Sequence, residues 1–196
     1  GLPREGDTMG LKLITAPAST PVSLAEVKSY MNESTTDFDT LLTSMIDIAT
    51  GHLDGPKGML GRAIITQTWE LHLDDFSDAI RIPIGPVALV TSVKYYDTAE
   101  VLQTVSSSNY AVDLVSTDAW IVPISTFDWP DVAEGINNVQ IRFVAGEATA
   151  PAAIKGAMLM LIAQWFWTRE GSSDKPVTEM PHSVSAMLAN HRDYGF

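Results

Sequence analysis

The chain has 196 residues, of which 45% are hydrophobic and 18% are charged, a balance typical of globular rather than disordered proteins. Its 24 acidic and 12 basic side chains give a formal net charge of -12, which disfavours tight binding to nucleic acid because such binding depends on clustered Lys and Arg. The absence of cysteine excludes disulfide bonds, thiolate metal sites and a cysteine nucleophile. The length suits one well-buried core, or a core with a sizeable insertion.

Two helices are predicted near the N-terminus, after an extended lead-in from Lys12 to Pro21. The sequence Ser-Leu-Ala-Glu places a hydroxyl at Ser23 and a carboxylate three residues later, so that each side chain can bind a free backbone amide of the other. This capping box predicts a helix from Leu24 to about Met31. A stripe of apolar residues predicts a second helix from about Asp37 to just before Gly55-Pro56.

From Gly58 onward the apolar period changes from that of a helix to that of strands. In the stretch 63–73, alternate side chains form an apolar face with Trp69 and Leu71 and a polar face with Glu70 and His72. Turn residues separate six further runs with strand character. These runs are Ile80–Ile84, Val87–Tyr96, Val101–Val105, Tyr110–Val115, Trp120–Val122 and Asn138–Ala145.

The stretch Pro151–Arg169 predicts a buried helix that begins with proline and carries no charge from Gly156 to Thr168. At about 1.5 Å of rise per residue this uncharged run spans roughly 20 Å, too short for the about 30 Å of a bilayer core. The helix belongs either to the core of one subunit or partly to a contact with a neighbouring subunit. The residues that repeat at helical spacing are Ile154, Ala157, Met158, Leu161, Ile162, Trp165 and Phe166.

The residues after this helix are predicted to form a loop, a short helix that begins at Pro181, and a C-terminal tail with two large aromatic residues. Chain ends usually fray, and the alternative is an arm whose aromatic residues fill pockets on a partner. The tail residues are Arg192, Asp193, Tyr194, Gly195 and Phe196.

These elements predict an α+β protein, in which a small helical bundle from the N- and C-terminal segments is interrupted by a large antiparallel β insertion. The expected boundaries are 1–22 for an N-terminal extension and lead-in, 23–57 for the first part of the bundle, 58–148 for the β-rich insertion, 149–191 for the second part of the bundle, and 192–196 for a docking tail.

The residue types that carry catalysis or bind metals do not form a recognisable site, and we expect no cofactor. No histidine has the spacing of a metal site, and Gly55–Gly58 lacks the spacing of a phosphate loop, so a turn is expected there. The residues considered for metal binding or catalysis are His52, His72, His182 and His191, with the pairs Asp37 and Asp39, and Asp74 and Asp75; neither aspartate pair fits a calcium loop.

The order of several short segments along the chain is more specific than any of them alone. The segments are Ile48–Leu53, Gly61–Trp69, Ile82–Val87, Val93–Asp97, Trp129-Pro130, Val139–Gly146, then Pro151, Ile154, Lys155 and Ala157, and finally Arg169-Glu170. In this order they resemble head-tail connector (adaptor) proteins of long-tailed phages and related gene transfer agents. The resemblance extends from Leu11 to about His191.

This resemblance implies a structural protein of the virion neck rather than an enzyme. Members of the family form a ring, usually twelvefold, that lies under the portal protein and extends the DNA channel toward the next neck or tail component, a stopper or a tail terminator. It implies that the bundle builds the ring, that the C-terminal segment reaches the portal, and that DNA passes through the lumen without specific binding. Assembly would take place in the host cytoplasm, and no membrane is involved. An acidic chain suits such a conduit because phosphates would not adhere to it.

The β insertion is large compared with mainly helical connectors, and we expect it to face outward or toward the next tail component. Two other interpretations remain open. In one, the β domain is a binding module for a carbohydrate or protein, and Trp69, Trp120 or Trp129 stacks on the ligand. In the other, the chain is an enzyme without a familiar motif.

Overall fold

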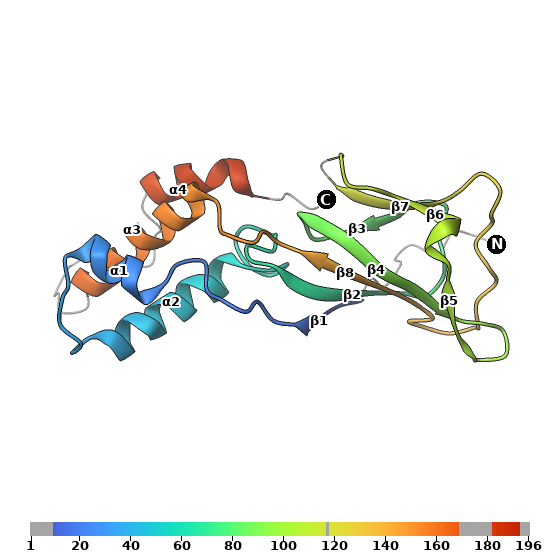
Figure 1. The fold of residues 1–196 in the computed structure, drawn as a ribbon, viewed down its shortest axis with the longest axis horizontal. Coiled ribbons are helices and arrows are strands. Elements are labelled where there is room, and N and C mark those ends of the chain that lie inside the picture. The colour runs from blue at the N-terminus through green and yellow to red at the C-terminus, as the bar shows by residue number, and fades with distance from the viewer. Residues whose placement is uncertain (1–9, 117, 169–181, 193–196) are drawn as a thin grey trace. The chain divides into compact units, whose positions relative to one another are not determined.

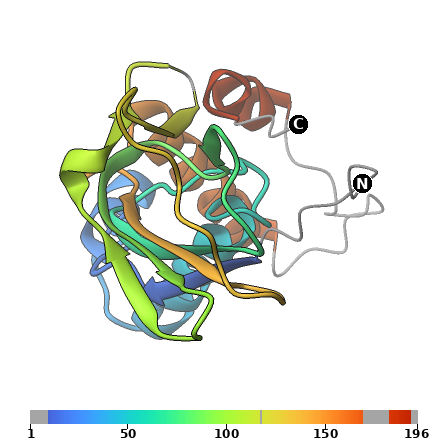
Figure 2. The same ribbon diagram turned by 90° about the vertical axis from the view of Figure 1, so that its right-hand side faces the viewer.

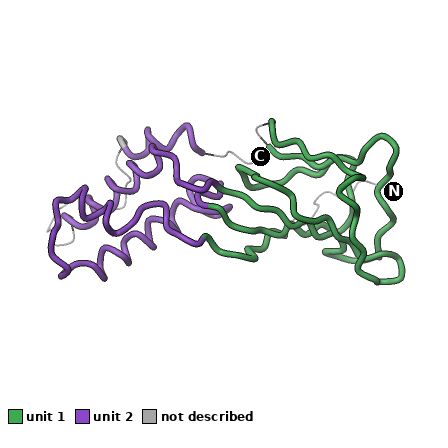
Figure 3. Tube along the Cα trace, in the orientation of Figure 1, with its two compact units in different colours: residues 1–17, 66–146 green, residues 18–65, 147–196 purple. Residues whose placement is uncertain are grey.

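The computed structural model describes residues 10–116, 118–168 and 182–192, and these residues divide between two compact units. One unit, of helices, contains 18–65 and 147–196, and the other, of strands, contains 1–17 and 66–146 (Figure 3). The chain thus enters the strand unit, passes through half of the helical unit, returns to the strands and finishes among the helices. The predicted α+β class is confirmed.

The helical unit is arranged around α3, which contacts each of the other three helices that the structure describes (Figure 1). The four are α1 (Leu24–Met31), α2 (Asp39–Leu53), α3 (Ala152–Thr168) and α4 (His182–Leu188), and a short 3-10 turn, Ala189–His191, follows α4.

Helix α1 begins at the predicted capping box. The Ser23 hydroxyl accepts from the Glu26 amide at 3.2 Å, and the Glu26 carboxylate accepts from the Ser23 amide at 2.7 Å. The helix ends at Asn32, which adopts a left-handed conformation with φ 55°, a common way for a helix to stop. Local sequence therefore determines both ends of this helix.

The strand unit contains two antiparallel sheets within the described residues. The larger has the order β1-β2-β8-β4-β5, with bounds Gly10–Thr15, Gln67–Leu73, Val139–Ala145, Val87–Tyr96 and Leu102–Val105. The smaller has the order β3-β7-β6, with bounds Ile80–Ile82, Ala119–Pro123 and Tyr110–Asp113.

The core of the strand unit lies between the two sheets, which form two layers in Figures 1 and 2. Leu71, Ile141 and Val93 lie side by side on three adjacent strands and are fully buried. Ile80 and Ile121 pair on the smaller sheet and are also buried. Because side chains alternate along a strand, the opposite surface of the larger sheet faces away from this core. We call that surface the outer face.

Several element bounds differ from those predicted. The expected strand 63–73 begins only at Gln67, because residues 63–65 are buried in the helical unit, where the Ile64 amide donates to the Asp54 carboxylate at 2.7 Å. Strand β6 stops at Asp113, whose carboxylate accepts from the Val115 and Ser116 amides and forms a turn. Residues 10–15, within the segment 1–22 that was predicted as an N-terminal extension and lead-in, form β1 at one edge of the larger sheet.

Candidate assembly surfaces

Helix α3 supplies the centre of the helical core. Its buried face includes all but one of the predicted interface or core positions, and the Phe166 ring meets the Phe38 ring edge to face with centroids 5.2 Å apart. Trp165 is half-buried. The structure thus places most of these side chains inside one chain, and a role in a ring contact stays a prediction. The buried residues are Ile154, Met158, Leu161, Ile162 and Phe166.

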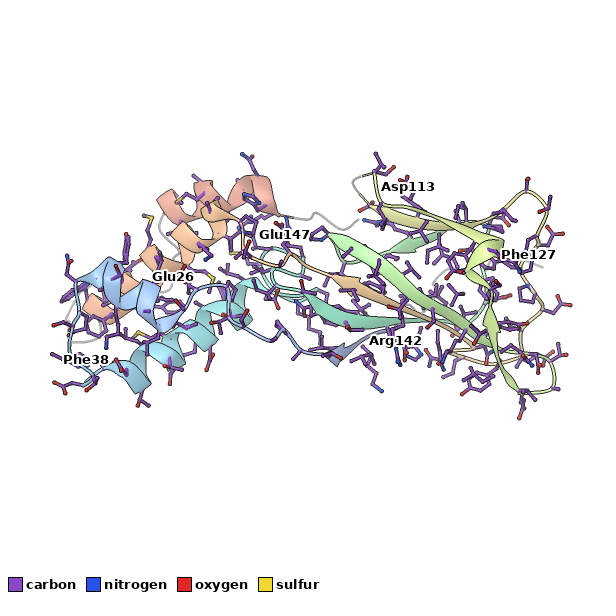
Figure 4. The ribbon with its side chains drawn as sticks, viewed as in Figure 1. Glu26, Phe38, Asp113, Phe127, Arg142 and Glu147 are labelled. Carbon is purple, nitrogen blue, oxygen red and sulfur yellow. The ribbon has the colours of Figure 1, made fainter. Side chains whose placement is uncertain are left out.

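Ion pairs fix α3 and its neighbours in place. Lys155 of α3 donates to the Glu26 carboxylate at 2.8 Å, and Lys28 of α1 donates to Asp39 of α2 at 2.6 Å. The hydrogen bond from Lys155, together with those from Ser23, lowers the pKa of Glu26 to about 2. Glu26 therefore caps one helix and anchors another (Figure 4).

Large apolar side chains also lie on the surface of the helical unit. Trp167, at the end of α3, is 68% exposed, and Ile48 on α2 is 61% exposed. Leu41 lies seven residues before Ile48, about two turns earlier on the same side of α2, and is 37% exposed. Tyr30 of α1 is also exposed. Where such exposed apolar groups form a contiguous patch, they mark protein contacts, and these residues are therefore candidates for one.

Among the tail residues Arg192–Phe196, only the first lies in the part of the chain that the structure describes. Arg192 follows the 3-10 turn Ala189–His191 and has an extended backbone. The remaining docking residues, Asp193, Tyr194, Gly195 and Phe196, lie outside the described residues, so the docking arm stays a prediction.

In the strand unit, aromatic side chains form one cluster. Phe76 and Trp129 stack face to face with centroids 4.6 Å apart and an angle of 3°. Tyr95 contacts Phe76, while Tyr110 and Phe127 contact Trp129. The sequence shows these residues singly, in four different segments, and their meeting depends on the fold.

The three tryptophans considered for stacking on a ligand differ in how far the rest of the chain covers their rings. Trp69 is 7% exposed and lies in the core, Trp129 is half-buried with Phe76 on its ring, and Trp120 is half-buried on β7. Two of the three thus have little free ring surface for a sugar.

Glu70 of β2 and Arg142 of β8 are opposite each other in the sheet register and form the main ion pair of the outer face. The guanidinium donates from Nε at 3.0 Å and from Nη2 at 2.6 Å to one carboxylate oxygen of Glu70. His72 lies 3.1 Å from the other oxygen. Figure 4 shows Arg142 on the side of the larger sheet away from Asp113, which belongs to the smaller sheet.

Within residues 10–116, 118–168 and 182–192, no three His, Asp or Glu side chains gather in a way that could hold a metal ion. Gly55–Gly58 is the predicted turn. None of the helices in these ranges has the length and apolar character needed to cross a membrane.

The chain is similar to known proteins in its three-dimensional structure, whereas comparisons of its sequence find no match. No protein-family model matches the sequence, and no curated protein matches it significantly. Solved structures do match, among them three with TM-scores of 0.66 to 0.68. One is the neck of an empty gene transfer agent (GTA) particle computed with C6 symmetry, with 25% identity over 93% of this chain and 95% of the matched chain.

The other two are the virion of a native GTA particle, at 23% identity, and the neck of a native GTA particle computed with C12 symmetry, at 24%. Each covers 93% of this chain and 94% of the matched chain. The chain has the fold of a GTA neck protein. This agrees with the resemblance to connectors of gene transfer agents that the sequence shows.

The structural match to the GTA particles includes the β insertion. A match over 93% of the chain takes in the strand unit as well as the helical unit. The insertion is therefore part of the shared neck-protein fold, although it is large beside mainly helical connectors.

Proposed function

We propose that this protein is the head-tail adaptor subunit of a gene transfer agent or a related phage. In this role it forms a ring beneath the portal, extends the DNA channel and joins the capsid to the tail. The observation that supports this most is the match over almost the whole length of both chains to a component of GTA necks. The place of the protein is the neck of the virion, and its function is structural rather than catalytic.

A ring of twelve subunits fits the symmetry of the matched particles, whose necks were computed with C6 and C12 symmetry. In any closed ring, each subunit contacts its two neighbours through two different surfaces. The exposed apolar side chains Ile48 and Trp167 belong to the helical unit, which is the part that we propose builds the ring. Burying such groups contributes roughly 25 cal/mol per Å² of apolar surface.

Our proposal assigns the tail Arg192–Phe196 to contact with the portal. Tyr194 and Phe196 are aromatic residues of the kind that anchor protein contacts by filling pockets. DNA would pass through the lumen without specific binding, because a net charge of -12 repels phosphates. The far side of the ring would receive a stopper or tail terminator.

The docking arm is tested by removing residues 192–196 and measuring binding to the purified portal ring. The truncated chain is expected to keep its melting temperature and to lose binding at least tenfold. A matched control replaces Lys57, an exposed side chain in the turn of the helical unit, with alanine and should bind as the full chain does. Undiminished binding by the truncated chain would show that the arm is not the contact.

A further inference from the structure

The outer face of the larger sheet carries several basic side chains of this acidic protein. Lys12, Glu70 and Arg142 lie in one row across β1, β2 and β8. His72 and Lys94 lie in the next row, on either side of Gln140. Because paired residues of adjacent strands point to the same side, all of these side chains lie on one face.

Two of these cations have no acidic partner among the described residues. Arg142 is paired with Glu70, but no ion pair joins Lys12 or Lys94 to any described residue. A shallow hollow of about 350 Å³ lies beside Lys12 on the same part of the sheet. It is lined by Gly10, Leu11, Lys12, His72, Asn137 and Gln140. This face therefore has two cations free to meet a negatively charged partner, and the loop 124–138 of the same chain borders the hollow through Asn137.

The same unit presents a surface of the opposite charge. The loops 74–79 and 124–138 are held together by the stacked rings of Phe76 and Trp129, and by the Asn137 amide, which donates to Asp74 at 2.9 Å. Their exposed carboxylates, which we call the acidic rim, are Asp75, Asp78, Asp128, Asp131 and Glu134.

The acidic rim also carries an apolar group suited to a contact. Ile136, two residues after Glu134, is 74% exposed. Because the aromatic stack and the Asp74 hydrogen bond already hold the two loops together, less conformational entropy is lost when the rim binds.

We propose that the acidic rim of one copy of this chain docks on the outer face of the next copy, where Lys12 and Lys94 meet its carboxylates. This inference rests on the proposed ring, since a closed ring needs two complementary surfaces on each subunit. Complementary charge sets the register of a contact and speeds its formation. The contact gives the strand unit a role in joining neighbouring subunits.

Charge reversal on each side separately provides the test. Lys12→Glu with Lys94→Glu makes the outer face acidic, and Asp131→Lys with Glu134→Lys makes part of the rim basic. On portal rings at 50 mM salt, each double variant is expected to form complete second tiers at least tenfold less often than the wild type, as counted by electron microscopy. Lys57→Glu, which reverses a cation outside both surfaces, should assemble normally.

Mixing the two double variants in equal amounts should restore the tier, because they can alternate around the ring. At one contact, the acidic rim of the first variant meets the basic outer face of the second. At the next contact, the basic rim of the second variant meets the acidic outer face of the first. Screening by 500 mM salt should weaken the wild-type tier.

Melting curves check folding, and Lys12→Gln with Lys94→Gln replaces the reversal if it unfolds the chain. Full assembly by both double variants, or a mixture no better than either alone, overturns this inference. A wild type that forms no tier overturns the ring itself.

Discussion

Replacing Leu161 with aspartate tests the interpretation of α3 as the centre of the helical core. Leu161 is 3% exposed and lies on the face of α3 that is packed within the bundle, with Met158 and Ile162 buried beside it. An aspartate there would place a carboxylate among apolar side chains. A matched change at Trp167, on the same helix but 68% exposed, leaves the new carboxylate in water.

The loss of folding stability expected for Leu161→Asp has two contributions. Losing the buried leucine side chain costs about 2–5 kcal/mol, as a change to alanine at this position would show. Burying an unpaired carboxylate adds several kcal/mol more. Since small domains are stable by only about 5–15 kcal/mol, Leu161→Asp should unfold the helical unit at room temperature, while Leu161→Ala should remain folded with a lower melting temperature.

Circular dichroism at 222 nm and thermal melting provide the assay. Leu161→Asp should lose much of its helical signal, and Trp167→Asp should melt within a few degrees of the wild type. At Trp165, which is half-buried, a charge should have an intermediate effect. A Leu161→Asp protein with wild-type melting and solubility would refute the assignment of α3 to the core.

Three further predictions concern individual side chains. Glu26→Gln should destabilise the protein by about 0.5–1 kcal/mol at pH 7; because the pKa of Glu26 is lowered from 4.5 to about 2, the difference from wild type should shrink as pH falls through that range, and a constant difference in acid melts would contradict it. Arg142→Gln should cost about 1–3 kcal/mol in urea unfolding by leaving Glu70 without its guanidinium, and adding Glu70→Gln should recover part of the loss; no recovery would mean that the pair is not coupled. Trp167→Phe should remove most of the red-shifted tryptophan emission that acrylamide quenches, and a spectrum that keeps it would place the exposed indole elsewhere.

Elements with strong local signals were predicted well from the sequence. The capping box determined α1, whose bounds Leu24–Met31 are those expected, and the predicted strand run Val87–Tyr96 is β4 to the residue. The apolar spacing of α3 identified its buried face, with Trp165 as the position that is less buried than expected. In these cases, residues that are close together in the sequence determine where the element lies.

Features that depend on distant contacts were not predicted. Strand β1 pairs with β2, more than fifty residues later, and its own sequence indicates only an extended chain. The aromatic cluster around Trp129 and the gathering of Lys12, Lys94 and Arg142 on one face follow from sheet register. Residues 63–65 directly precede β2 and were expected to begin that strand, yet the helical core buries them, because tertiary packing overrides a short local pattern.

The most direct test of the central claim is electron microscopy of this protein mixed with the portal ring encoded near it, with each component imaged alone. The adaptor function predicts a second tier beneath the portal, with twelvefold symmetry and the strand unit within the tier. A portal that stays bare at micromolar concentrations of a folded chain would contradict the adaptor function. It would leave only the fold in common with the neck proteins of gene transfer agents.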